Sequence, residues 1–239
     1  MDELARLYRV RFTDAERARK DAIWRVLCER FFQRYVPPDA TVLDLACGYG
    51  EFMRHIKAGR KIAVDLNPET RSLLPPDVEF HQTDAANLPI DSASVHVCFS
   101  SNFFEHLPSK TRLDQVLQES LRVLRPGGLY LCMQPNLRYA PGEYWDYYDH
   151  VLPLTHLSCQ EAFRKAGFEV IELIDRFIPF STASRLPQAP WLVRLYLAFR
   201  PAWRLLGRQF VLVARKPAPG PGLVRDQGGP SNDSSRKSN

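Results

Sequence analysis

Residues 41–52 constrain this chain most, because a short apolar run passes directly into a glycine loop and then into a segment that can start a helix. Glycine has no Cβ, so Gly48 and Gly50 allow the backbone to approach a ligand closely and to adopt positive φ angles. The first N–H groups of the helix expected from Glu51 have no partner within that helix. A strand, a glycine loop and a helix in this order predict a site for a nucleotide-containing cofactor.

The spacing of the glycines separates two cofactor classes. A dinucleotide fingerprint requires a third glycine three residues after the second, and Met53 occupies that position. An acidic residue, Asp44, precedes the glycines instead. An oxidoreductase that uses NAD is therefore the weaker alternative.

Two more acidic residues follow predicted strands. Asp65 ends the strand predicted at 61–65, where a carboxylate can accept hydrogen bonds from both hydroxyls of a ribose. Asp84 lies at the exit of the strand predicted within 78–85. The acids and glycines thus lie in chain order on three successive strand ends: Asp44, Gly48, Gly50, Asp65 and Asp84.

This ordered set resembles the motifs of the class I S-adenosylmethionine (SAM)-dependent methyltransferases, in particular their type 11 branch. The first motif of that family usually reads Asp/Glu-x-Gly-x-Gly-x-Gly, so Ala46 stands where the first glycine is usual. Alanine is the mildest replacement, and we expect the turn to survive. The resemblance covers about residues 37–216 and implies SAM as the cofactor.

The resemblance also implies roles for individual residues. Asp65 would hold the ribose, Asp84 would accept a hydrogen bond from the adenine amino group, and the Ala85 N–H would face the adenine ring. The expected cofactor-binding residues are Asp44, Ala46, Gly48, Gly50, Asp65, Leu66, Asp84, Ala85 and Ser101.

The fold that the resemblance implies is α/β and Rossmann-like. Its seven-stranded sheet would have the order 3-2-1-4-5-7-6, with the last strand antiparallel and helices on both faces. The strands are expected at 41–46, 61–65, 78–85, 95–100, 129–133, 168–173 and 209–216. A sharp turn at 125–128 should precede the fifth strand, and Ser158 with Glu161 forms a capping box for a late helix.

Three segments lie outside the generic core. Residues 1–36 are expected to form a helical cap, which covers either the cofactor pocket or only the sheet. Residues 177–208 form an insertion within the 37–216 domain, and Pro201 should divide it into two short helices. The insertion is open to four interpretations: a lid, a dimer contact, plain packing, or peripheral contact with a membrane surface. Residues 217–239 have the composition of a disordered tail.

The segment after the fourth predicted strand bears on the reaction. Methyltransferases that act on the amino groups of bases usually carry Asn/Asp-Pro-Pro-Tyr/Phe there, and this chain has Glu105-His106-Leu107 instead. Those three residues resemble the type 11 branch, which acts largely on small molecules. Nucleic acid is therefore an unfavoured acceptor, and the basic pI of about 9.0 does not require it.

Aromatic and ionisable residues crowd the stretch 134–156, which borders the acceptor pocket in class I methyltransferases. Residues 145–150 also resemble, more loosely, uncharacterised bacterial methyltransferases associated with glycan assembly. We therefore expect a small-molecule, sugar or lipid-linked glycan acceptor, methylated at oxygen. His150 backed by Asp149 is the first candidate for the base, followed by His106 and His156. The alternative is an aromatic-rich packing loop with a buried histidine.

The five scattered cysteines contain no Cys-x-x-Cys pair, so neither a disulfide framework nor a metal site is expected. The amino terminus lacks the apolar stretch of a signal peptide, and a cytoplasmic location is expected, with the membrane surface as the open alternative. A non-catalytic partner subunit with the same fold also remains open, because an intact cofactor motif supports binding but does not prove turnover.

Overall fold

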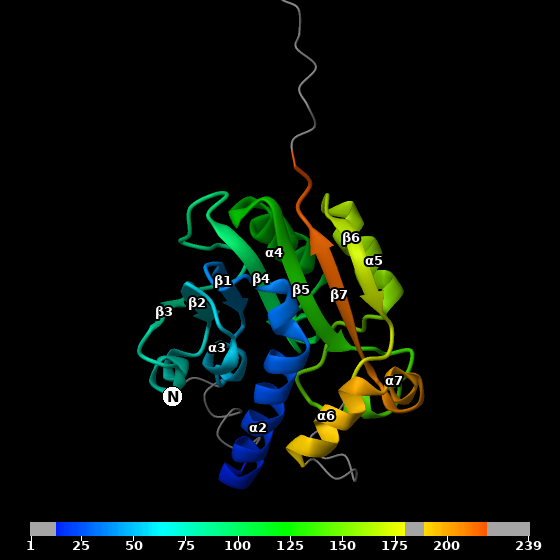
Figure 1. Ribbon diagram of the computed structural model, residues 1–239. Helices are drawn as coiled ribbons and strands as arrows, with labels where there is room; N and C mark the ends of the chain where they lie inside the picture. The colour runs from blue at the N-terminus through cyan, green and yellow to red at the C-terminus, as the bar shows by residue number, and fades with distance from the viewer. Residues whose placement is uncertain (1–12, 180–188, 219–239) are drawn as a thin grey trace, which may run out of the picture.

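A computed structural model describes residues 13–179 and 189–218, so the predictions for residues 1–12 and 219–239 lie outside the described residues. One seven-stranded sheet organises the described chain in the order β3-β2-β1-β4-β5-β7-β6, as predicted (Figure 1). The strands are β1 (Thr41–Leu45), β2 (Arg60–Asp65), β3 (Val78–Gln82), β4 (Val95–Ser101), β5 (Leu124–Pro135), β6 (Glu169–Ile174) and β7 (Gln209–Arg215).

Strands β1 to β5 are parallel to one another, whereas β7 runs antiparallel to both β5 and β6. The predicted antiparallel last strand is therefore confirmed. Because β1, β2 and β4 are parallel and adjacent, their carboxyl ends meet at one edge of the sheet. That edge carries the residues that the sequence selects for cofactor binding.

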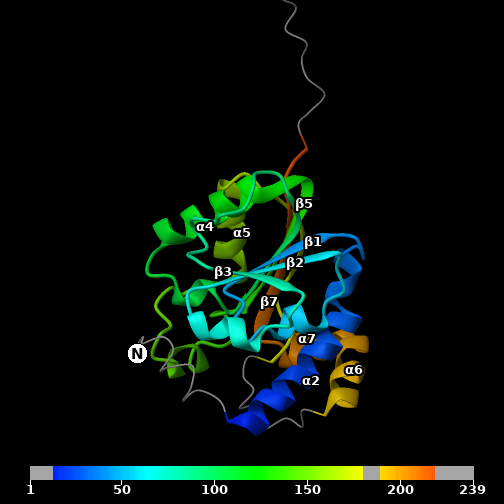
Figure 2. The same cartoon turned by 90° about the vertical axis from the view of Figure 1, so that its left-hand side faces the viewer.

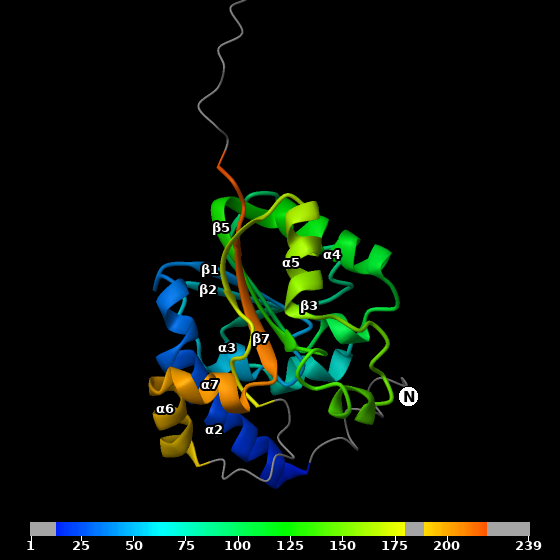
Figure 3. The same ribbon diagram turned by 90° about the vertical axis from the view of Figure 1, so that its right-hand side faces the viewer.

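Helices cover both faces of the sheet. Figures 1 and 3 show α4 and α5 on one face, and α2, α3, α6 and α7 on the other. The helices are α2 (Asp14–Arg30), α3 (Glu51–His55), α4 (Lys110–Val123), α5 (His156–Lys165), α6 (Pro190–Ala198) and α7 (Arg200–Leu206). Short 3-10 turns are η1 (Phe32–Tyr35), η2 (Pro68–Leu73), η3 (Phe104–His106) and η4 (Glu143–Asp146).

The apolar residues of β1 show why the sheet needs both helical layers. Successive side chains of a strand point to opposite faces. Leu43 and Leu45 enter the core that includes residues of α4 and α5, whereas Val42 enters the core that includes residues of α2 and α3. All three are fully buried, as expected for a parallel strand covered on both sides.

The amino-terminal helix and the late insertion pack together on one side of the molecule. Figures 1 and 2 show α6 beside α2, and residues of the two helices are in contact. Pro201 lies in the first turn of α7, and the insertion is divided at Phe199, as predicted. Trp203 of α7 is buried against Phe31 and Phe177, so part of the insertion belongs to the core.

Two predicted boundaries were wrong. Helix α5 begins at His156 with Thr155 as its N-cap, because the Thr155 hydroxyl accepts from the Ser158 N–H and the Ser158 side chain accepts from the Thr155 N–H. Ser158 thus occupies the N3 position of the capping box and not the predicted N-cap position. Strand β5 already begins at Leu124, since Gly127 and Gly128 pair with Lys216 and extend the sheet through the predicted turn.

The described residues include no helix with the length and hydrophobicity needed to cross a membrane. The strongly apolar segment of the insertion is instead divided into two helices of nine and seven residues. Neither approaches the about 20 residues that a transmembrane helix needs.

Candidate functional site

The loop between β1 and α3 turns sharply through three residues with positive φ. Gly48 and Gly50 have φ angles of 57° and 74°, and Ala46 has a φ of 55°. A side chain in this left-handed region is strained, and alanine is the smallest that can be placed there. The expectation that the turn survives with Ala46 is confirmed.

Asp65 at the end of β2 holds this loop in place. One of its carboxylate oxygens accepts a hydrogen bond from the Gly48 N–H at 2.8 Å, and the other accepts from the Asn67 N–H at 2.8 Å. The Cys47 N–H donates to the carbonyl of Val64 on the same strand, at 3.0 Å. The strand end therefore fixes the shape of the glycine loop through its side chain and through its backbone.

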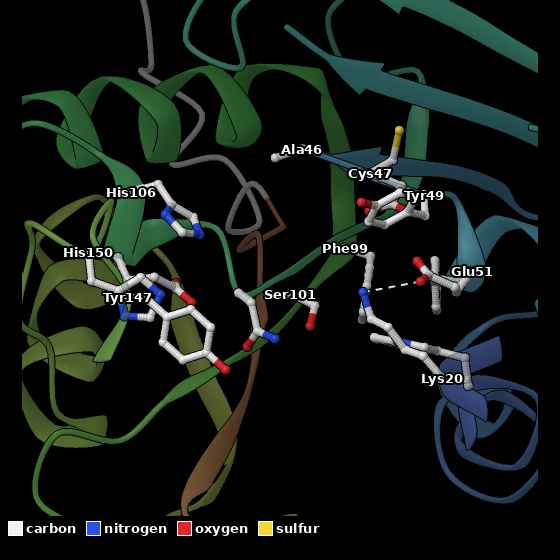
Figure 4. A pocket seen from close by; sticks show the side chains of 16 residues that line it. Lys20, Ala46, Cys47, Tyr49, Glu51, Phe99, Ser101, His106, Tyr147 and His150 are labelled. Carbon is white, nitrogen blue, oxygen red and sulfur yellow. Dashed lines mark ion pairs between the residues drawn. The ribbon is translucent and has the colours of Figure 1, made fainter. Parts of the chain in front are cut away.

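A cavity of about 160 Å³ lies at this edge of the sheet, over the carboxyl ends of β1 and β4. Figure 4 shows Lys20, Tyr49, Glu51 and Phe99 on one side of it and His106, Tyr147 and His150 on the other, with Ser101 between. Its lining residues are Lys20, Trp24, Asp44, Ala46, Cys47, Gly48, Tyr49, Glu51, Phe52, Phe99, Ser101, Asn102, Glu105, His106, Tyr147 and His150.

Helix α2 forms one wall of the cavity through Lys20 and Trp24. Lys20 makes an ion pair with Glu51 at 3.1 Å, which joins α2 to the first turn of α3. The guanidinium of Arg17 lies 4.7 Å from the centre of the Tyr49 ring, within the range of a cation–π contact. The amino-terminal helix thus borders the predicted cofactor pocket as well as covering the sheet.

Asp44 lies at the base of the glycine loop and is almost fully buried. Burial raises the pKa of Asp44 well above its ordinary value, and the nearby Asp65 and Glu51 carboxylates raise it further. Burial also raises the pKa of Asp65, although the backbone N–H groups that it binds oppose this effect. Negative charge at this end of the cavity is therefore costly, and a hydrogen-bond donor or a cation on a ligand would be favoured there.

Phe99 on β4 lines the cavity on the side of the glycine loop (Figure 4). Its ring stacks on Phe52 of α3 with the centroids 3.7 Å apart and the planes inclined by 10°. Two residues further along β4, the Ser101 Oγ is buried and has no hydrogen-bond partner among the described residues. A buried polar atom of this kind at the wall of a cavity fits a site for a polar ligand.

The opposite end of the cavity holds an imidazole and carboxylate cluster made by Glu105, His106 and His150. His106 Nδ1 lies 3.1 Å from a carboxylate oxygen of Asp149. Burial by itself would lower the pKa of His106, but the hydrogen bond with Asp149 and the charges of Glu105 and Asp149 outweigh it and raise that pKa. Asp149, which the sequence suggested as support for His150, thus makes an ion pair with His106.

His150 is oriented by a backbone carbonyl instead. Its Nδ1 lies 2.8 Å from the carbonyl oxygen of Tyr144, and a carbonyl can only accept, so Nδ1 carries the proton. The ring of Tyr147 stacks on the His150 ring, with the centroids 4.8 Å apart. The proton-accepting nitrogen of the neutral His150 ring is therefore Nε2.

The remaining predicted residues lie outside the cavity lining. Asp84 forms an ion pair with Arg112 at the start of α4, and Ala85 beside it is buried. Leu66 is exposed. Gly50 and Asp65 determine the shape of the loop, Gly50 through its positive φ and Asp65 through its hydrogen bond with the Gly48 N–H. His156 is buried and hydrogen-bonded to Asn136, so it does not join the cluster.

Several lining residues were not selected from the sequence: Lys20, Trp24, Cys47, Tyr49, Glu51, Phe52, Phe99, Asn102, Glu105 and Tyr147. Glu105 carried the clearest signal, since Glu-His follows a predicted strand at the reaction-facing edge. Lys20 gave no signal of its own, because basic residues recur throughout the amino-terminal helix.

The sheet order, the antiparallel β7 and the glycine loop after β1 together define the fold of the class I SAM-dependent methyltransferases. Residues 43–132 match the family described as "Methyltransferase domain". That segment runs from β1 through the Ser101 and Glu105 region to β5, and so includes most of the cavity lining.

Two curated relatives support the same class. A probable SAM-dependent methyltransferase of Mycolicibacterium smegmatis is 32% identical over 143 residues, which are 57% of this chain and 54% of the relative. A demethylmenaquinone methyltransferase of Chlorobaculum parvum is 30% identical over 147 residues, which are 56% of this chain and 58% of the relative. The chain therefore spans just over half the length of the curated relatives that it matches.

Among solved structures, a chain of the complex between the Haloferax volcanii Trm112 methyltransferase activator and a methyltransferase shares the fold, with a TM-score of 0.66. The match covers 91% of this chain and 99% of that chain at 22% identity. The domain match and the curated relatives identify SAM as the cofactor.

The residues present fit this cofactor. Gly48 lines the cavity and has no side chain, so a ligand can approach the loop backbone closely at this position. The buried Ser101 Oγ offers a hydrogen bond, and the buried carboxylate of Asp44 favours a positively charged group nearby. SAM carries such groups on its ammonium and sulfonium.

Proposed function

We propose that this protein is a SAM-dependent methyltransferase that methylates a hydroxyl of a small-molecule, sugar or lipid-linked glycan acceptor. One observation carries the proposal: a single cavity joins a glycine loop of the cofactor-binding type to a cluster of two imidazoles and a carboxylate. The end with the glycine loop, the donor end, suits the methyl donor. The end with Glu105, His106 and His150, the acceptor end, suits an acceptor group that must lose a proton.

The residues that would bind the methyl donor are inferred from the family resemblance together with the geometry of the cavity. Asp44, Ala46, Gly48 and Ser101 line the cavity and would contact the cofactor directly. Gly50, Asp65, Leu66, Asp84 and Ala85 keep the roles that the resemblance assigns, with Asp65 also holding the loop. Carboxylate oxygens accept more than one hydrogen bond, so Asp65 can bind Gly48 and a ribose hydroxyl together.

When bound, SAM supplies a methyl group on a sulfonium, and the electron pair of the broken S–C bond stays on sulfur. The residues of the chain hold the acceptor in line and keep water from the reacting centre. The acceptor oxygen gives its proton to His150 Nε2 as it forms its new bond to carbon, and the Tyr144 carbonyl keeps that nitrogen aimed correctly. His106 with Asp149 is the second candidate for this task.

The surface of the insertion supports an acceptor presented at a membrane. Trp191, Leu195, Phe199 and Leu205 of the α6–α7 region are all more than half exposed. Aromatic and aliphatic side chains exposed on short helices are typical of contact with a lipid surface. We therefore include lipid-linked glycans among the acceptors and peripheral membrane contact among the interactions.

The test is to incubate the protein with methyl-labelled SAM and a lysate of its own host, and then to separate the lysate into classes. We expect label in the lipid, polysaccharide or small-molecule fraction, with alkali-stable attachment at oxygen. Label in protein or nucleic acid would contradict the acceptor class. Binding of S-adenosylhomocysteine without any label would favour the partner-subunit interpretation, and binding of NADH alone would favour the oxidoreductase.

A further inference from the structure

The cluster at the acceptor end has the composition of a metal site. Glu105, His106 and His150 each offer one ligand atom, and these atoms lie within 4.8 Å of one another. Glu105 and His150 are buried, His106 is partly buried, and all three line the cavity. They come from two segments of the chain, since η3 follows β4 and His150 follows η4.

The hydrogen bonds behind the two imidazoles orient both rings for coordination. His106 Nδ1 faces the carboxylate and the carbonyl of Asp149, at 3.1 and 3.2 Å. His150 Nδ1 faces the carbonyl of Tyr144 at 2.8 Å. These partners accept hydrogen bonds, so Nδ1 carries the proton in each neutral ring and Nε2 carries the lone pair. Metal-binding histidines are held in this way, by a carboxylate or a carbonyl at the second nitrogen.

We propose that Glu105, His106 and His150 bind a divalent transition metal ion that takes the acceptor oxygen as a further ligand. The sequence led us to expect no metal. This inference rests on the proposed function and refines it, because His150 then acts as a ligand rather than as the base. The cation would do the same work by another route, because a coordinated hydroxyl loses its proton more readily, and the proton would pass to solvent water.

The donor set narrows the choice of metal. Two imidazole nitrogens and one carboxylate suit zinc, manganese, iron or cobalt, whereas calcium and magnesium prefer oxygen ligands. Three protein ligands leave positions open for a substrate, as catalytic metal sites do. Asp149 adds negative charge behind His106, which favours a cation at this end of the cavity.

The probe is Co²⁺, whose visible absorption reports imidazole and carboxylate coordination. The full-length protein is freed of metal with a chelator and titrated with Co²⁺, followed by absorption and by calorimetry. We expect one equivalent to bind. Glu105→Gln, His106→Gln and His150→Gln should each weaken binding by at least about tenfold to a hundredfold. His81→Gln is the matched control, because His81 lies on β3, is paired with Glu79 and does not line the cavity.

Folding is measured separately. Circular dichroism and S-adenosylhomocysteine binding show whether each variant keeps its structure. Glu105→Gln is the most informative variant, because glutamine keeps the shape of the side chain and removes its charge.

The outcomes separate this inference from the proposed function. Failure of the wild type to bind Co²⁺, or equal binding by the wild type and the folded cluster variants, overturns the metal site and leaves methyl transfer untouched. Methyl transfer that continues undiminished in excess chelator also overturns it. Co²⁺ binding that depends on the cluster supports the site even where no methylated product forms, in which case the proposed function fails alone.

Discussion

The two ends of the cavity are built in different ways. At the donor end, the glycine loop lies between adjacent elements β1 and α3, and its shape depends on backbone angles at Ala46, Gly48 and Gly50. At the acceptor end, side chains from residues 101–106 and 147–150 meet although more than forty positions separate them in the chain. The donor end is therefore a local backbone structure, whereas the acceptor end depends on how β4 and β5 place the loops that follow them.

This difference predicts different responses to mutation. Changes at the donor end should disturb the fold and cofactor binding together, because the loop is continuous with the sheet. Changes at the acceptor end should reduce turnover and leave both the fold and cofactor binding nearly unchanged. Each of the following variants tests one side of that distinction.

The largest effect is expected for Gly50→Val. Gly50 has a φ of 74°, and a Cβ there would lie 2.4 Å from a methyl carbon of Leu74. A β-branched residue in the left-handed region adds strain to this clash, and we expect a loss of about 2–4 kcal/mol in the free energy of unfolding. Affinity for S-adenosylhomocysteine should fall by about tenfold or more. Thermal denaturation and calorimetry measure the two effects.

Gly142→Ala is the matched control for the glycine variant. Gly142 has a φ of −83°, and a Cβ added there would meet no atom within 4 Å. We expect a change of less than about 0.5 kcal/mol. Equal losses in the two variants would show that the loop geometry is not what makes Gly50 necessary.

An intermediate effect is expected for Tyr147→Ala at the acceptor end. The ring of Tyr147 stacks on His150, and such aromatic contacts contribute about 0.5–1.5 kcal/mol. Its removal should lower kcat/KM by about three- to tenfold with the acceptor found in the labelling experiment. Affinity for S-adenosylhomocysteine should not change.

Tyr148→Ala is the neighbouring control, since the Tyr148 side chain is 95% exposed. We expect it to keep full turnover. A parallel loss of turnover in both tyrosine variants would mean that the segment acts as a surface for the acceptor and that the stack on His150 is unimportant. Loss of cofactor affinity in Tyr147→Ala would contradict the expectation that changes at the acceptor end leave cofactor binding unchanged.

The smallest effect is expected for Ala46→Gly. Glycine removes the strain of about 1–2 kcal/mol that a Cβ suffers at positive φ. It also increases the freedom of the unfolded chain, which costs about 0.4–1 kcal/mol. The net result should be a gain of about 0.5 kcal/mol in the free energy of unfolding, measured by denaturant titration. The control Ala18→Gly, at an exposed position of α2, should cost about 1 kcal/mol because glycine weakens a helix.

The sequence predicted local features of the fold better than features that depend on contacts between distant segments. The strand order and the antiparallel β7 were predicted from the family resemblance, which rests on motifs at the ends of successive strands. The boundaries of α5 and β5 were wrong. Capping at Thr155 depends on a reciprocal contact with Ser158, and the extension of β5 depends on pairing with the distant Lys216.

At the acceptor end the sequence identified His106, Asp149 and His150 as candidates, but it did not indicate that Asp149 contacts His106. Neighbours in sequence, Asp149 and His150, were expected to act together. In the fold, Asp149 turns toward His106, and the carbonyl of Tyr144 orients His150. Glu105 was overlooked as a functional residue, because its position beside both imidazoles depends on the approach of two loops.

The sequence by itself determined the strand, glycine loop and helix at 41–52, because these depend on local backbone preference, and its ordered motifs indicated the sheet and the class of cofactor through the family resemblance. The tertiary structure alone decided which side chains share the acceptor end of the cavity. The physical reason is that hydrogen bonds and metal-type clusters require distances of a few ångströms between residues such as Glu105 and His150, and spacing along the chain does not specify those distances.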